Sequence, residues 1–191
     1  MATPAVTGAP TTLPRRRFTV AEFYRLGEAG ILTADDRIEL IQGDLVPMTP
    51  VGPRHAAAVD RLDDQLRAAL GARARVRIQN TVRLSNDTEP LPDVVVCQRR
   101  EYTDQHPTPT DILLIIEVVD TSAERDRYKL SLYARAGVTE TWLVDLTADI
   151  IEVHREPGPN GYRLVRRCRP GDTLTVDAFP EVAIAVADLL A

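Results

Sequence analysis

The sequence predicts an α/β protein whose buried strands end in acidic residues. Residues 112–116 form an unbroken apolar run rich in β-branched side chains, which is typical of a strand buried on both faces, and Glu117 follows this run. A helical segment comes next, and its Asp126 and Lys129 are three residues apart and therefore lie on one face. A second apolar run covers residues 141–145 and ends in an aspartate. Strand, helix and strand with acids at the strand ends is how an α/β protein presents a functional site.

The composition is that of one soluble domain. The 191 residues suffice for a sizeable core, and 44% hydrophobic and 27% charged residues are ordinary for a globular protein. No apolar run is long enough to span a membrane and no signal peptide is recognisable, so we expect no membrane partner. Cys97 and Cys168 lack metal-ligand spacing, which predicts buried thiols and a reducing, cytoplasmic location.

The N-terminal residues differ in character from the rest of the chain. Residues 1–17 are rich in Ala, Thr, Pro and Gly and end in three arginines, so we expect a disordered tail before a single domain of residues 18–191. Thr19 and Glu22 match a capping box, which predicts that a short helix begins there.

The remaining elements follow from apolar periodicity and turn residues. Gln42-Gly43 predicts a hairpin, with Glu39 inside its first strand, and Gly137 is the expected end of the helix that a second capping box, Thr121 to Glu124, begins. After Asp145 the pattern becomes all β. The predicted strands are 37–41, 44–48, 73–78, 94–97, 112–116, 141–144, 150–155 and 162–166, with later apolar stretches at 174–176 and 182–190, and the predicted helices are 19–27, 54–70 and 121–136.

One stretch is locally basic although the net charge is −5. That net charge argues against a protein that coats nucleic acid through bulk charge, but a nuclease stays possible because it needs basic residues only locally. Residues 73–78 alternate arginine with small or apolar residues, which predicts a strand with Arg73, Arg75 and Arg77 on one face. A nucleic-acid-binding surface and a solvated strand face explain this pattern equally well.

Two acids stand at the ends of apolar runs that a loop connects. Asp93 opens the run 94–97 and Glu117 ends the run 112–116, so the two carboxylates converge if these strands are neighbours. Oxygen ligands of this kind suit Mg²⁺ or Mn²⁺, which activate water and polarise phosphate. Lys129 is the one lysine among 23 lysine and arginine residues, and its compact ammonium could neutralise a transition-state charge or help orient the water.

Ordinary structural roles explain the same residues. An Asp after a proline is often a turn-former, and a Glu at a sheet edge can pair with an arginine. Lys129 and Asp126 could form a simple helix-surface pair.

Taken as an ordered set, several segments resemble the Uma2 family of bacterial proteins, which are classed as restriction endonucleases. The resemblance covers residue 18 to the C-terminus and implies a PD-(D/E)XK restriction-endonuclease-like core, a central mixed β-sheet flanked by helices, with an added β-rich C-terminal part. The segments that carry it are 37–46, His55, 92–96, 117–118, Asp126, Lys129, Tyr133, 137–138 and 142–145.

The resemblance implies roles for individual residues. Asp93 matches the first acid of the nuclease motif, Glu117 the second, and Glu39 an early acid at the metal site. The motif lysine is missing, since Val119 occupies its position, and Lys129 on the following helix matches a displaced lysine. The further candidates are the Val118 carbonyl as a metal ligand and His55, Asp120 and Asp126 as accessory groups. Asp120 and Thr141 depart from the family pattern, which commonly has Ser and Tyr there.

These observations lead to three functional hypotheses. The first is a Mg²⁺- or Mn²⁺-dependent endonuclease that hydrolyses DNA, expected to act as a homodimer and to need no organic cofactor. The second is a non-catalytic nucleic-acid-binding or assembly module on the same fold. The third is a metal-dependent hydrolase of another phosphate ester.

Overall fold

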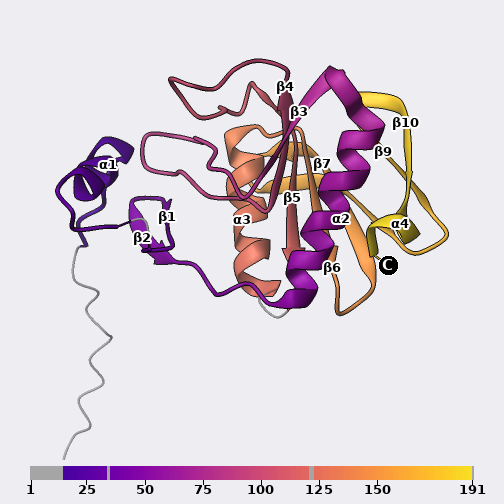
Figure 1. Cartoon of the computed structure of the whole chain (residues 1–191), viewed down its shortest axis with the longest axis horizontal. Coiled ribbons are helices and arrows are strands. Elements are labelled where there is room, and N and C mark those ends of the chain that lie inside the picture. Colours follow the sequence, from indigo (N-terminus) through magenta and orange to yellow (C-terminus); the bar gives the residue numbers. More distant parts are fainter. Residues whose placement is uncertain (1–14, 34, 121–122, 191) are drawn as a thin grey trace, which may run out of the picture.

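The computed structural model describes residues 15–33, 35–120 and 123–190 (Figure 1). Residues 1–14 of the tail predicted for residues 1–17, and the start of the capping box predicted from Thr121, lie outside the described residues. None of the described helices is long and apolar enough to cross a membrane.

A mixed six-stranded sheet forms the centre of the fold, in the order β3-β4-β5-β6-β7-β8. Only β5 and β6 pair in parallel, joined by helix α3, and every other neighbouring pair is antiparallel. The strands are β3 (Ala74–Ile78), β4 (Val94–Gln98), β5 (Ile112–Val119), β6 (Glu140–Asp145), β7 (Ile150–Gly158) and β8 (Gly161–Cys168). The predicted class, an α/β fold with a central mixed sheet, is therefore confirmed.

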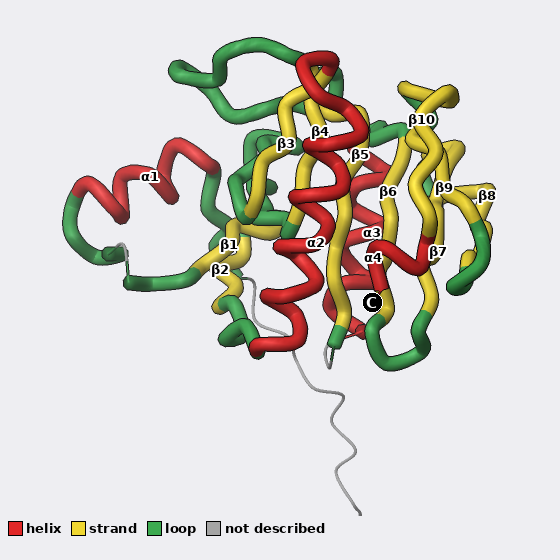
Figure 2. Tube along the Cα trace, turned by 45° about the vertical axis from the view of Figure 1, so that its right-hand side comes forward, coloured by secondary structure: helices red, strands yellow, loops and turns green. Residues whose placement is uncertain are grey.

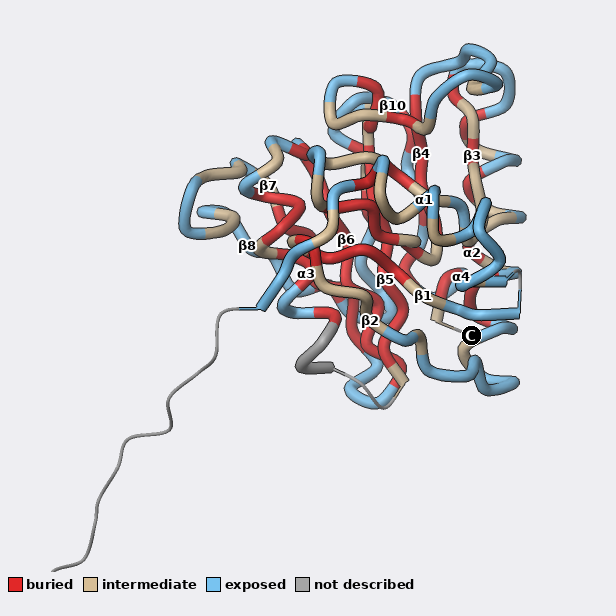
Figure 3. The backbone as a smooth tube through the Cα atoms, turned by 90° about the vertical axis from the view of Figure 1, so that its left-hand side faces the viewer, coloured by how far each residue is buried: buried red, intermediate tan, exposed pale blue. Residues whose placement is uncertain are grey.

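Helices cover both faces of this sheet, with α2 (Pro53–Leu70) in front and α3 (Ala123–Ala136) behind in Figure 2. Alternate residues of one strand pack against the helices on opposite faces of the sheet. In β4, Val94 and Val96 pack with side chains of α2, and Val95 packs with Tyr133 of α3. The centre of the sheet is consequently buried on both sides (Figure 3), as the apolar runs predicted.

A small hairpin and a helix form the N-terminal part, outside the main sheet. Helix α1 (Val20–Glu28) begins with the predicted capping box at Thr19, and β1 (Ile38–Ile41) pairs with β2 (Asp44–Pro47). The hairpin turn needs Gly43, because its φ is +80° and a Cβ there would lie 2.5 Å from the Cβ of Arg17. Arg17 also donates to the Gln42 carbonyl at 2.6 Å, so the end of the predicted disordered tail contacts the hairpin.

The C-terminal part departs from the all-β expectation. Strands β7 and β8 are longer than predicted and leave only Pro159 and Asn160 between them. The hairpin of β9 (Thr173–Val176) and β10 (Phe179–Ala185) is followed by a short helix, α4 (Val186–Leu190), where a continuous β-stretch was predicted. The reason is packing, since Val186 and Leu189 are buried one helical turn apart and join the core beneath α2.

Candidate active site

Asp93 and Glu117 lie side by side because β4 and β5 are antiparallel neighbours. Val94 pairs with Ile116, so Asp93, one residue earlier, stands opposite Glu117, one residue later. Asp93 Oδ2 also accepts a hydrogen bond from the backbone nitrogen of Val118 at 2.8 Å. The condition on which the predicted pair of carboxylates depended, adjacent strands, is therefore met.

Lys129 of α3 reaches two carboxylates from separate parts of the fold. Its ammonium lies 2.6 Å from Oε1 of Glu39 in β1 and 3.5 Å from Oε1 of Glu117. All three side chains are buried, and Glu39 Oε1 also accepts a hydrogen bond from the Leu91 nitrogen at 2.8 Å. Lys129 thus belongs to the buried site and is no helix-surface residue.

Tyr133 is the residue at this site whose contact the sequence did not predict. Its hydroxyl donates to Glu117 Oε1, one helical turn after Lys129. In the sequence, Tyr133 was only one of the residues that carry the family resemblance, with no role of its own in the site. The signal that could have found it is the four-residue spacing, which puts Tyr133 and Lys129 on the same helix face.

The three predicted accessory residues surround this cluster. His55, in the first turn of α2, makes a hydrogen bond through Nε2 to Asp93 Oδ2 at 3.1 Å, and this bond and the charge of Asp93 raise the pKa of His55. Asp120 Oδ1 accepts from Arg54 at 3.3 Å. Asp126 is buried on α3, where its charge bears on both Glu117 and Lys129.

These groups line one cavity of about 260 Å³, which we call the acidic cavity. Its acidic side chains come from β1, the start of β4, the end of β5 and α3, and its basic ones are Arg37, His55 and Lys129. Every predicted catalytic, metal and accessory residue is in its wall: Glu39, His55, Asp93, Glu117, Val118, Asp120, Asp126 and Lys129.

The electrostatics of the acidic cavity favour a bound cation. Burial raises the pKa of Glu117 to about 8, against the opposing field of Lys129, and the charges of Asp93 and Asp126 add to the rise. Burial by itself would lower the pKa of Lys129, but the carboxylates of Glu117 and Glu39 raise it above its usual value. Lys129 therefore stays protonated at neutral pH, and the site still holds more acids than cations.

The oxygen donors here suit a hard divalent ion. Asp93, Glu117 and the Val118 carbonyl are neighbouring groups where two paired strands meet, and hard oxygen ligands of this type fit Mg²⁺ or Mn²⁺. Within the described residues no three His, Cys, Asp or Glu side chains form a ready-made ligand group. Glu39 lines the same cavity and holds Lys129, so the residues fit a site in which Asp93, Glu117 and the Val118 carbonyl bind the ion and Glu39 stands beside them. A metal contact of Glu39 itself stays a prediction.

None of the three predicted basic residues lines the acidic cavity. Arg73 is not in β3 but in the short 3₁₀ turn before it, where its guanidinium contacts Glu181 at 2.5 Å. Arg75 pairs with Glu101 at 2.6 Å, and Arg77 donates to Asn80 at 3.1 Å. The three arginines therefore do not form one free strip, because a 3₁₀ turn and two acids interrupt it.

Comparison with solved structures shows that the chain shares its fold with a protein that is described as a nuclease. A crystal structure described as "a putative nuclease belonging to DUF820" from Anabaena variabilis superposes with a TM-score of 0.72 at 18% identity, over 91% of this chain and 97% of that chain. The type IIG restriction endonuclease BpuSI aligns with a TM-score of 0.39 at 19% identity, over 59% of this chain and 13% of that chain.

The chain belongs to the Uma2 family, which is described as "Putative restriction endonuclease" and matches residues 20–187. No curated protein matches the chain. The family resemblance seen in the sequence is thereby confirmed over nearly the whole described chain.

Proposed function

We propose that this protein is a Mg²⁺- or Mn²⁺-dependent endonuclease that hydrolyses phosphodiester bonds of DNA in the acidic cavity. The observation that carries the proposal is that Asp93, Glu117 and Lys129 come together in the wall of one cavity. Membership in a family of nuclease fold supports it. Fold alone does not fix function, so the chemistry of these side chains weighs more than the fold.

Asp93, Glu117 and the Val118 carbonyl are the groups that would hold the metal. A divalent ion bound there would lower the pKa of a water molecule and polarise the phosphate. His55 and Tyr133 orient the two carboxylates through their hydrogen bonds to Asp93 Oδ2 and Glu117 Oε1.

Lys129 acts as a fixed cation in this proposal. Because Glu117 and Glu39 raise its pKa, it remains an ammonium and does not serve as a general base. Its positive charge beside Glu117 would stabilise the negative charge that develops on a phosphate oxygen during hydrolysis. Glu39 holds the ammonium in place.

The test is a plasmid-nicking assay with Mg²⁺ or Mn²⁺, run beside the Asp93→Asn and Lys129→Met variants. We expect metal-dependent nicking by the wild type and a rate lower by at least about a hundredfold in either variant. Nicking that persists in both purified variants would overturn the assignment. DNA binding with no metal-stimulated cleavage would instead favour the non-catalytic module.

A further inference from the structure

A second cavity, of about 640 Å³, lies along the outer edge of β3, the end strand of the sheet. We call it the basic groove. Its charged lining is four arginines, from α2, β3 and the residue after β4, and a single aspartate: Arg67, Arg75, Arg77, Arg99 and Asp63. In a chain of net charge −5, such a groove is a local reversal of sign that attracts an anion.

The groove is not shaped to accept an added β-strand. Arg67 Nη2 donates to the Val76 carbonyl at 3.1 Å, and Asn80 Nδ2 donates to the Ile78 carbonyl at 2.6 Å. Side chains of the protein therefore already occupy acceptors on the open edge of β3, which is a common protection against strand addition. With strand addition excluded, the positive charge of its guanidinium groups is the feature through which the groove could bind a ligand.

Two of the four arginines carry charge that no described carboxylate neutralises. Arg67 pairs with Asp63 and Arg75 with Glu101, but within the described residues neither Arg77 nor Arg99 forms an ion pair. The guanidinium of Arg77 is held instead by the Asn80 side chain at 3.1 Å and by the ring of Tyr102, 5.5 Å from its centroid. A held but unpaired guanidinium is prepared to bind an anion.

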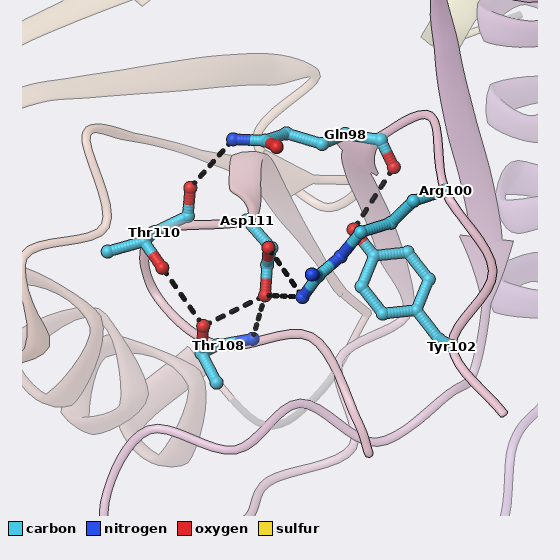
Figure 4. Close-up of polar contacts among 6 residues, drawn as sticks. All are labelled: Gln98, Arg100, Tyr102, Thr108, Thr110 and Asp111. Atoms are coloured by element: carbon cyan, nitrogen blue, oxygen red, sulfur yellow. Dashed lines mark hydrogen bonds and ion pairs between the residues drawn. The ribbon is translucent and has the colours of Figure 1, made fainter. Parts of the chain in front are cut away.

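The loop after β4 is braced so that this wall of the groove keeps its shape (Figure 4). The Tyr102 hydroxyl donates to the Gln98 carbonyl at 3.0 Å, and Arg100 pairs with Asp111 at 2.8 Å. Asp111 also accepts from the nitrogen of Thr108 at 2.9 Å. Arg100 is thus used within the loop, whereas its neighbour Arg99 lines the groove.

The basic groove adjoins the acidic cavity. Ile78 and Asn80 line the groove, and Gln79 between them lines the cavity. Helix α2 runs beside both, with His55 at the cavity and Arg67 at the groove, a separation of about 18 Å along a helix axis. One strand of a duplex carries a phosphate about every 3.4 Å, so this length corresponds to roughly five phosphates.

We infer that the basic groove binds the phosphodiester backbone of a nucleic acid whose reacting bond lies in the acidic cavity. The inference rests on the proposed function and deepens it, because it assigns the surface outside the acidic cavity that holds the polymer. It also changes the set of binding residues, since Arg73 does not line the groove. Arg67 and Arg99 take its place.

The test measures binding without cleavage, by fluorescence anisotropy in metal-free buffer with a chelator. The probes are a labelled DNA duplex and a labelled RNA duplex of the same sequence, each longer than the span of cavity and groove. The double variant Arg77→Gln/Arg99→Gln is compared with Arg163→Gln/Arg166→Gln, a matched loss of two charges on β8 at the opposite edge of the sheet. Thermal unfolding verifies that both variants are folded.

We expect the groove variant to bind at least about tenfold more weakly and the β8 variant to bind like the wild type. The slope of log affinity against log salt should fall by about 0.9 for each phosphate that the groove variant no longer neutralises, and the duplex whose affinity falls more identifies the polymer. Equal binding by both variants, or no binding of either duplex by the wild type, would overturn the inference. Groove-dependent binding without plasmid nicking would refute the proposed hydrolysis alone.

Discussion

The ammonium of Lys129 lies 2.6 Å from Oε1 of Glu39, and this ion pair joins helix α3 to the β1–β2 hairpin. The hairpin is not part of the six-stranded sheet, so such contacts fix its position. A second one is made by the neighbouring Tyr128, whose hydroxyl donates to the Gln42 side chain. The one lysine of the chain therefore lies between two carboxylates of the acidic cavity, one on the docked hairpin and one on β5.

Removing Glu39 should cost substantial stability. The Glu39→Ala variant removes the closer of the two carboxylates that pair with the buried Lys129, and it also removes the acceptor of the Leu91 N–H. The free energy of unfolding should therefore fall by about 3 kcal/mol. Urea denaturation measures this. The control is Glu101→Ala, which breaks an exposed pair with Arg75 and should cost less than about 1 kcal/mol. Equal losses in both variants would refute a special role for the buried pair.

Lys129 should not be replaceable even by arginine. A planar guanidinium is larger than an ammonium and does not fit between two carboxylates that stand 2.6 and 3.5 Å from Nζ. We expect Lys129→Arg and Lys129→Met both to lower the Mn²⁺-dependent nicking rate by about 10²–10³. Arg135→Gln, a change on the same helix, should nick at the wild-type rate. Full activity in Lys129→Arg would show that only its charge matters.

Metal binding should depend on Asp93 and, more weakly, on its hydrogen-bond partner. In calorimetric titration with Mn²⁺, Asp93→Asn should abolish the binding heat. His55→Phe, which loses the 3.1 Å bond to Asp93, should weaken binding by about 10–100-fold. Asp87→Asn removes a surface carboxylate that is bound to Ser85 and should leave the titration unchanged. A wild-type-like titration of Asp93→Asn would place the metal elsewhere.

A buried histidine outside the acidic cavity, His154, should make the stability of the protein sensitive to acid. Burial lowers the pKa of His154 from 6.5, with a contribution from Arg127, although the Glu152 carboxylate 3.3 Å away opposes the shift. The ring of Tyr162 is the other near neighbour. The unfolded chain therefore binds the proton more readily than the folded protein does.

It follows that the stability present above about pH 6.5 is partly lost as the pH falls through the folded-state pKa of His154. We measure the free energy of unfolding by urea denaturation at a series of pH values across this range. Its decrease with falling pH should be smaller for His154→Gln than for the wild type. Above pH 6.5 the two curves should run parallel. Parallel curves on the acid side as well would mean that His154 does not contribute.

The sequence predicted the elements well where the signal was local. The apolar runs of β4, β5 and β6 and the capping box at Thr19 specify structure within a few residues, and the structure confirms them. The α4 helix was missed because a five-residue helix is too short to show a helical period. Arg73 was assigned to a strand because alternation alone does not reveal a 3₁₀ turn at its start.

By itself the sequence determined which residues could form a site: an acid at the start of one buried strand, an acid near the end of the next, and a single lysine on the following helix. Only the tertiary structure decided how they meet. The antiparallel pairing of β4 with β5 puts Asp93 opposite Glu117, and the docked hairpin brings Glu39 to Lys129. The same holds for the basic groove, whose arginines come from three separate segments. Local periodicity encodes strands and helices, whereas contacts between distant segments depend on strand order and packing, which no local pattern contains.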